Sequence, residues 1–257
     1  MRLVCFANNW TGCRVIEFLA TQPDRIVAVV LHPSATRTYG DEIRSAVGLA
    51  DEFVFDGSKL GDPGAVEAIS ALKPDLGVSL LFNFILRKTL LDVFPAGVIN
   101  LHPGYLPFNR GQYPNVWSLV DRTPAGVTLH YIDEGVDTGD IIAQQRVDVD
   151  PADTGETLYR KLERASVELF KETWPLIRSG SPPRRPQTGA GTSHRTADVD
   201  RIDRIDLDRS YTARALIDIL RARTFPPHDG AYFAVDGRRY QLRLELHERS
   251  TDGDGLG

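Results

Sequence analysis

The chain has 257 residues, of which 42% are hydrophobic and 25% charged, with 22 Gly, 16 Pro and 2 Cys. This balance is typical of a globular protein and excludes a disordered chain, a collagen or a disulfide-rich scaffold. The net charge of −5 divides into −6 over the first 180 residues (17 Lys and Arg against 23 Asp and Glu) and +1 over the rest (13 against 12). Neither part has the basic surface expected of a nucleic-acid binder.

The location of the protein is predicted from its apolar runs and its cysteines. No apolar run approaches the roughly 20 residues needed to cross a bilayer. The first ten residues also lack a secretory hydrophobic stretch and a cleavage site. Cys5 and Cys13 fall in an expected buried strand and in the helix after it, which favours reduced thiols. These features predict a cytoplasmic protein.

Short apolar runs alternate with amphipathic stretches over the first 100 residues. The pattern predicts helices and strands in alternation, with strands at Leu3–Ala7, Ile26–Leu31, Asp75–Leu80 and Gly97–Asn100 and helices at Gly12–Ala20 and Gly64–Leu72. Strand, helix and strand at this spacing form an open sheet with helices on both faces. The predicted fold class is therefore α/β, with an open, mainly parallel, Rossmann-like sheet.

Two further strands and one long helix complete this first domain. The strands are expected at Ala125–Ile132 and Ile141–Asp148, and the helix at Thr154–Ile177, with Thr154 or Thr157 as its cap. The stretch Ser179–His194 is dense in Gly, Pro, Ser and Arg, which indicates a linker. We therefore predict a first domain over residues 1–180.

The remaining residues, 181–257, are predicted to form the linker and a small α+β module that ends in a β-hairpin. A helix is expected at Thr212–Arg221, and two strands, Tyr232–Val235 and Arg239–Leu246, flank the turn Asp236-Gly237. Such a hairpin leaves aromatic and apolar side chains in water, namely Tyr232, Phe233, Tyr240 and Leu242. Since exposed apolar area of this kind favours association, a homodimer is predicted.

Polar side chains cluster at the end of the strand that closes with Asn100. Asn100 and His102 share one face of an extended segment, at the carboxyl edge of the sheet where ligands of such folds bind. Taken singly, an Asn at a strand end or a His beside a Pro is more often structural. A second loop, ending in Asp137-Thr138-Gly139, supplies a carboxylate that can orient and tune a histidine.

The runs from Asn100 to Gly111 and from His130 to Asp140 together resemble the formyltransferase family, over roughly residues 1–180. The resemblance implies the formyltransferase fold and 10-formyltetrahydrofolate as co-substrate. It also implies an Asn-His-Asp catalytic triad at Asn100, His102 and Asp137. In formyl transfer to an amine, an amide N–H stabilises the oxyanion and a histidine relays the proton.

Alternative roles exist for the other polar residues of these two runs. His130 is expected to be structural, and Asp133 and Glu134 to shape their loop. His102, His130, Asp133 and Asp137 offer metal-ligand types, but their spacing matches no zinc pattern, so no metal is predicted.

The family's pterin pocket implies a folate site beside the strand that ends near Leu80. Its predicted residues are Leu81, Phe82, Asn83, Phe84, Ile85 and, from the second loop, Asp133. Apolar side chains there would sandwich a flat ring while backbone groups read its edge. The alternative is that Phe82 and Phe84 belong to the core.

The acceptor is suggested by the residues after Arg110-Gly111. The run Tyr113-Pro114-Asn115-Val116-Trp117 resembles the dTDP-sugar N-formyltransferases. The C-terminal module is also too short, and carries too little positive charge, to bind the body of a tRNA. The predicted acceptor residues are Asn9, Trp10, Tyr105, Phe108, Arg110, Gln112, Tyr113 and Trp117. Each aromatic side chain among them has packing as its alternative role.

The resemblance therefore predicts a sugar N-formyltransferase. Its best-fitting acceptor is dTDP-4-amino-4,6-dideoxyglucose, for lipopolysaccharide O-antigen or another surface glycan. The choice between a C3 and a C4 amine and the identity of the base stay open. The alternatives are a formyltetrahydrofolate hydrolase, a methionyl-tRNA formyltransferase-like enzyme, and a silent folate- or nucleotide-sugar-binding module. The absence of Gly-x-Gly-x-x-Gly disfavours a nicotinamide enzyme.

Overall fold

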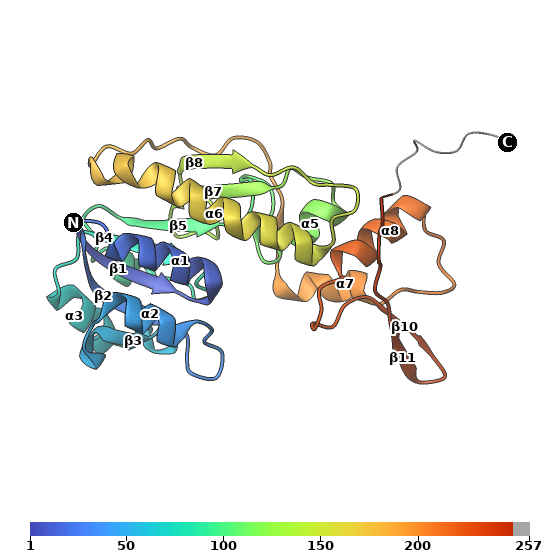
Figure 1. Ribbon diagram of the computed structural model, residues 1–257, viewed down its shortest axis with the longest axis horizontal. Coiled ribbons are helices and arrows are strands. Elements are labelled where there is room, and N and C mark those ends of the chain that lie inside the picture. The colour runs from blue at the N-terminus through green and yellow to red at the C-terminus, as the bar shows by residue number, and fades with distance from the viewer. Residues whose placement is uncertain (249–257) are drawn as a thin grey trace.

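The structure, a computed structural model, describes residues 1–248 (Figure 1). Residues 249–257, the end of the predicted C-terminal module, lie outside the described part. The helices and strands are β1 (Arg2–Ala7), α1 (Asn9–Ala20), β2 (Arg25–Leu31), α2 (Gly40–Val47), β3 (Val54–Asp56), α3 (Pro63–Ala71), β4 (Leu76–Leu80), α4 (Lys88–Leu91), β5 (Val98–His102), β6 (Arg110–Gly111), α5 (Pro114–Val120), β7 (Gly126–Tyr131), β8 (Ile141–Arg146), α6 (Gly155–Arg178), β9 (Ser193–His194), α7 (Asp200–Asp203), α8 (Ala213–Ala222), β10 (Tyr232–Val235) and β11 (Arg238–Gln241).

A seven-stranded sheet forms the centre of the molecule, in the order β3-β2-β1-β4-β5-β7-β8. The strands from β3 to β5 are parallel, and β7 and β8 join them antiparallel. Parallel strands need crossover connections, and here α1, α2, α3 and α4 lie in the successive connections from β1 to β5. The predicted α/β class with a mainly parallel sheet is confirmed.

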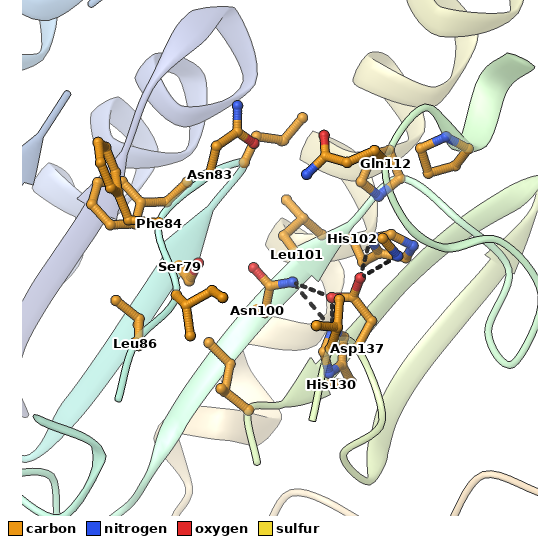
Figure 2. Close-up of a pocket in the computed structure, with 18 of the residues that line it drawn as sticks. Ser79, Asn83, Phe84, Leu86, Asn100, Leu101, His102, Gln112, His130 and Asp137 are labelled. Carbon is orange, nitrogen blue, oxygen red and sulfur yellow. Dashed lines mark hydrogen bonds and ion pairs between the residues drawn. The ribbon is translucent and has the colours of Figure 1, made fainter. Parts of the chain in front are cut away.

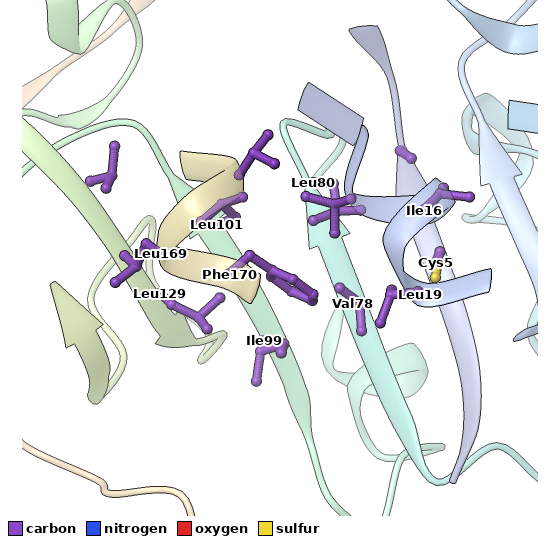
Figure 3. Close-up of a cluster of buried hydrophobic side chains, with 14 of the residues drawn as sticks. Cys5, Ile16, Leu19, Val78, Leu80, Ile99, Leu101, Leu129, Leu169 and Phe170 are labelled. Carbon is purple, nitrogen blue, oxygen red and sulfur yellow. The ribbon is translucent and has the colours of Figure 1, made fainter. Parts of the chain in front are cut away.

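Both faces of the sheet are covered by helices, which explains the unbroken apolar sequence of its central strands. In β1, Leu3 and Cys5 pack in the cluster that α1 and α6 complete, whereas Val4 and Phe6 pack in the opposite cluster with α3 and α4. Alternate side chains of a strand point to opposite faces, so a strand buried on both faces must be apolar throughout. Figure 3 shows the first cluster.

The long helix α6 closes the first of these clusters. Thr154 caps it through its side chain, which accepts a hydrogen bond from Thr157 N–H, and Thr157 returns the bond. Phe170 and Trp174 are stacked and almost fully buried against the sheet. Replacing either aromatic by Ala is expected to cost about 3–5 kcal/mol of folding free energy.

The C-terminal part contains α8 and the predicted hairpin. Asp236 and Gly237 form its turn with positive φ values of 49° and 73°, as a two-residue turn between twisted strands requires. The second strand ends at Gln241 rather than at the predicted Leu246. Leu242 N–H still donates to Ala231 O in the register of the hairpin, but Leu244 N–H donates to Thr224 Oγ1, away from β10.

Several short elements had no clear sequence signal. Helices α2, α4 and α5 and strand β3 were not predicted, and each has only three to eight residues. The predicted linker is irregular except for β9, whose residues pair in parallel with β6, and for a bridge between Arg185 and Ile141. Within residues 1–248, no helix has the length and apolar character to cross a membrane.

Candidate active site

A pocket of about 390 Å³ opens at the carboxyl edge of the sheet, beside the ends of β1, β4 and β5 (Figure 2). This is the edge at which open parallel sheets bind ligands. Its volume lies within the range of small-molecule sites. Asn100, His102, His130 and Asp137 form one wall, and the loop after β4 forms the opposite one.

Strand β5 positions the two polar side chains of that wall. Val98 packs in the cluster with α3 and α4, and the period of two places Asn100 and His102 on the same face. Strand β7 pairs antiparallel with β5, and this register sets His130 directly opposite Asn100. The pairing explains why these two side chains meet.

Asn100 and His130 contact each other and the carboxylate of Asp137. The Asn100 Nδ2 lies 3.1 Å from His130 Nε2 and 3.4 Å from Asp137 Oδ1. His130 Nδ1 lies 2.8 Å from the carbonyl oxygen of Tyr131, which can only accept, so Nδ1 carries a proton. His130 Nε2 faces both the Asn100 amide and, at 3.4 Å, Asp137 Oδ1.

His102 is held between a carbonyl and a carboxylate. Its Nε2 lies 2.9 Å from Asn109 O, and its Nδ1 lies 3.5 Å from Asp137 Oδ2. Since the carbonyl only accepts, Nε2 carries the proton and Nδ1 is a free base that faces Asp137. Burial lowers the pKa of His102 below its usual range, although the charge of Asp137 acts in the opposite direction. The ring is therefore neutral near pH 7.

Asp137 adopts a backbone conformation that few residues other than Gly accept, with φ of 53°. Its Oδ2 accepts a hydrogen bond of 2.8 Å from Gly111 N–H. Burial alone would raise the pKa of Asp137, but His102, His130 and Gly111 N–H outweigh it, and the pKa falls well below its usual range. Asp137 thus remains ionised beside two histidines.

This arrangement can take up one proton without leaving an N–H unpaired. If Nδ1 of His102 is protonated, its two N–H groups face Asn109 O and the Asp137 carboxylate. Asn100 offers an N–H whose present partner, at 3.4 Å, is distant enough to be replaced by a stronger acceptor. The wall therefore combines a base with a hydrogen-bond donor for a developing oxyanion.

The residues predicted for folate all line the pocket, from Leu81 to Ile85 and at Asp133. Phe82 is also part of the core, where it packs on Phe6, and both Phe82 and Phe84 make edge contacts with His32. Ile85 is 78% exposed at the mouth of the pocket. Asp133 shapes its own loop, since it accepts from Gly135 N–H and Thr138 Oγ1.

The predicted acceptor residues fall into two groups. Asn9, Gln112 and Tyr113 line the pocket. Trp10 lines a different cavity, between α1 and α6, and the structure places the remaining four away from the pocket wall: Tyr105, Phe108, Arg110 and Trp117.

Three of the residues outside the pocket have partners elsewhere. Tyr105 lies under the Arg146 guanidinium, and Trp117 stacks on His194 with ring centroids 4.0 Å apart. Arg110 donates to the side chain of Gln187.

Sequence reasoning missed several residues of the site. His130 was expected to be structural, yet it contacts both Asn100 and Asp137. The feature that could have identified His130 is its position opposite Asn100, and finding that position requires knowledge of the antiparallel register of β5 and β7. Tyr159 of α6 also lines the pocket, and burial raises its pKa to about 12, so its hydroxyl keeps its proton. Among residues 1–248, no group of three or more His, Cys, Asp or Glu is placed to hold a metal ion.

Comparison with known proteins assigns both parts of the chain to family models. Residues 15–173 match the model described as formyl transferase, and residues 198–248 match the N-formyltransferase dimerization C-terminal domain. The methionyl-tRNA formyltransferase of Geotalea daltonii is 30% identical over 261 residues, covering 99% of this chain and 81% of that protein.

Solved structures with the same fold include two formyltransferases. A 4-N formyltransferase from Francisella tularensis is 26% identical with a TM-score of 0.81, covering 96% of this chain and 98% of that one. A formyltransferase from Anoxybacillus kamchatkensis, in complex with UDP-4,6-dideoxy-4-formamido-L-AltNAc and tetrahydrofolate, is 30% identical with a TM-score of 0.59, covering 78% and 89%. The chain belongs to the formyl transferase family and is a formyl-transferring enzyme.

Proposed function

We propose that the protein is a sugar N-formyltransferase that moves a formyl group from 10-formyltetrahydrofolate to an amino group of a nucleotide-linked dideoxyhexose. The observation that carries the proposal is the pocket wall, where Asn100, His102 and Asp137 converge. The likeness to the Francisella enzyme supports it, because that likeness extends over nearly the full length of both chains.

The amine is proposed to be on C4 of the sugar, with dTDP-4-amino-4,6-dideoxyglucose as the acceptor. The Francisella protein is a 4-N formyltransferase, and the Anoxybacillus complex contains a 4-formamido sugar. That second ligand is UDP-linked, so thymidine and uridine are the two bases to compare. Transfer in the cytoplasm, with lipopolysaccharide O-antigen or another surface glycan as destination, completes the proposal.

The chemistry follows from the three side chains. The lone pair of the acceptor amine attacks the formyl carbon, and the carbonyl electron pair becomes an oxyanion that the Asn100 N–H stabilises. When the oxyanion collapses, the bond between the formyl carbon and N10 of the folate breaks. The proton lost by the attacking nitrogen passes through His102, with Asp137 balancing its charge, and ends on N10.

Folate binding is proposed for the wall opposite the triad. Leu81, Phe82, Asn83, Phe84 and Ile85 form one edge of the pocket and Asp133 another. Apolar side chains can cover the faces of a pterin there, and the exposed backbone groups of the loop can pair with its edge.

The C-terminal module is proposed to form a homodimer interface, with the domain boundary near residue 180. The dimerization model over residues 198–248 supports this assignment. Val235 and Tyr240 of the hairpin are 41% and 45% exposed, which leaves apolar area for a second copy to cover. Sedimentation equilibrium tests it: a single species of twice the mass supports the interface, and a monomer at micromolar concentration contradicts it.

The experiment that tests the function combines 10-formyltetrahydrofolate with a panel of dTDP- and UDP-linked 3-amino and 4-amino sugars. Tetrahydrofolate release and product mass are measured together, with a no-sugar control. One sugar gaining the mass of a formyl group in place of hydrogen supports the proposal and identifies the base. Folate turnover without sugar indicates a hydrolase instead. Folate binding with no turnover on any acceptor indicates a silent binding module.

A second candidate, methionyl-tRNA formylation, is favoured by the 30% identity to the Geotalea enzyme. This chain spans 81% of that protein. Charged initiator tRNA therefore belongs in the panel. Formylmethionyl-tRNA as the only product would replace the sugar proposal.

A further inference from the structure

The segment that joins the two parts of the chain, residues 179–195, is called here the connecting segment. It passes along the edge of the sheet beside β8 and then reaches the loops that carry the site (Figure 1). Arg185 forms a backbone bridge with Ile141, and further on β9 pairs with β6. The segment is thus attached at two places on either side of Gln187, to β8 of the central sheet and to the short strand β6.

Gln187 lies between those attachments and contacts the Asp137 loop. Its Nε2 donates to Asp137 O at 2.7 Å and to Gly139 O at 2.9 Å. Its Oε1 accepts from Arg110 Nε at 3.1 Å and from Arg110 Nη2 at 2.7 Å. The Gln187 amide therefore links the Arg110 guanidinium to the backbone of Asp137 and Gly139.

We propose that Gln187 is a positioning residue for formyl transfer, which holds the backbone of Asp137 in the left-handed conformation that aims its carboxylate at His102. The inference rests on the proposed function of the triad. Arg110, one of the predicted acceptor residues, serves in this view to orient the Gln187 amide.

The backbone of Asp137 explains why such support is needed. A φ of 53° is uncommon for a residue with a side chain, although Asp adopts it more readily than most, and surrounding hydrogen bonds stabilise it. The carboxylate is fixed by Gly111 N–H, and Gly111 itself belongs to β6, which β9 of the connecting segment pairs with. Gln187 fixes the other end of the same residue, at its carbonyl.

Thr192 of the same segment supports the other contact of His102, the one between its Nε2 and Asn109 O. Thr192 Oγ1 accepts from Asn109 N–H at 2.8 Å, and Thr192 O accepts from Arg110 N–H at 3.0 Å. The carbonyl of Asn109 is the partner of His102 Nε2. The connecting segment therefore supports both groups between which His102 is held.

The test compares Gln187→Leu with Gln144→Leu. Gln144 is a matched control, because it is also half-buried and its Nε2 also donates two hydrogen bonds, to Leu106 O and Thr128 Oγ1, outside the pocket lining. For Gln187→Leu we expect kcat to fall roughly 10- to 100-fold, the scale of a small misplacement of a reacting group, with KM for both substrates nearly unchanged. Gln144→Leu is expected to keep wild-type kcat.

A pH titration separates positioning from a general structural effect. Asp137 raises the pKa of His102 against the effect of burial. A displaced Asp137 therefore lowers the pKa of His102, and the acid limb of kcat/KM moves to lower pH in Gln187→Leu only. Wild-type kcat and an unmoved acid limb in Gln187→Leu would overturn the proposal, as would equal changes in both variants.

Two further measurements keep the result interpretable. Gln187→Glu retains an acceptor for Arg110 but has no N–H for Asp137, so it should fold and still lose turnover; wild-type turnover in it overturns the inference. NMR titration of the His102 ring needs no acceptor, and so tests positioning even if wild-type protein formylates none of the sugars tried. If wild-type protein formylates none of the sugars, the proposed function is rejected but the role of Gln187 is not. If the His102 pKa in Gln187→Leu equals that in wild type, the role of Gln187 is rejected.

Discussion

The two walls of the pocket are built in different ways. On the triad wall, His102 is buried, Asn100 and Asp137 are partly buried, and hydrogen bonds fix His102 and Asp137 in place. On the opposite wall, the loop after β4 presents an apolar side chain to solvent, because Ile85 is 78% exposed. The chemistry thus depends on preorganised polar geometry, and ligand binding depends on apolar area that a ligand can cover.

Asn100→Ala should give the largest effect, since it removes a group from the triad wall that is needed only in the transition state. We expect kcat to fall about 10²- to 10³-fold, the loss typical of one oxyanion donor. Affinity for the nucleotide and the folate should stay near wild type. The measurement is single-turnover kinetics together with calorimetric titration of both ligands. Unchanged turnover would remove Asn100 from the mechanism.

Asp137→Asn tests the electrostatic part of the same wall. We expect a fall in kcat of about 100-fold, within the range for acid–base groups. The carboxylate raises the pKa of His102 and burial lowers it. Without that charge, the lowering effect of burial on the pKa of His102 loses its main opponent, so the acid limb of kcat/KM should move to lower pH. A full pH–rate profile measures this, and a shift to higher pH contradicts the assigned pair.

Arg110→Ala decides whether this cation acts through Gln187 or binds the acceptor. If it acts through Gln187, kcat should fall about tenfold and the acceptor KM should change little. If it binds the diphosphate of the acceptor, KM should rise instead while kcat is retained. Steady-state kinetics with the best sugar of the panel distinguishes the two results.

Ile85→Ala should give the smallest effect and should act on binding only. Because Ile85 is exposed, the free energy of unfolding should stay within about 0.5 kcal/mol of wild type. The KM for 10-formyltetrahydrofolate should rise a few fold, and kcat should not change. Phe82→Ala serves as the comparison, because Phe82 is only 9% exposed and packs in the core. Chemical denaturation should show that its free energy of unfolding falls by about 3 kcal/mol. Equal destabilisation of both variants would contradict the division of this wall into a core residue and an exposed one.

How far the sequence predicts this site depends on how local each contact is. Asn100 and His102 are two residues apart on one strand, so their shared face follows from the strand period alone. The contact between Asn100 and His130 depends on an antiparallel register 30 residues away, and no local pattern specifies that register. Trp117 carried an aromatic signal, but its stacking on His194 links residues 77 positions apart.

Helices and strands, too, could be predicted only where a local sequence pattern specifies them. Strands with continuous apolar runs and the capped helix α6 were predicted nearly to their ends. Short helices such as α5 were not, because seven residues carry too little periodicity to differ from a loop. Gln187, in a segment that reads as a linker, gave no signal, since its role arises only from where the segment lies.

The path of the connecting segment also affects how this enzyme can be recombined with its relatives. A fragment that ends at residue 180 would contain the whole triad and still lack Gln187 and Thr192, the two residues that support it from outside. A chimera that exchanges C-terminal modules should therefore be joined after residue 195. In such a chimera, residues 181–195 should come from the same parent protein as residues 1–180.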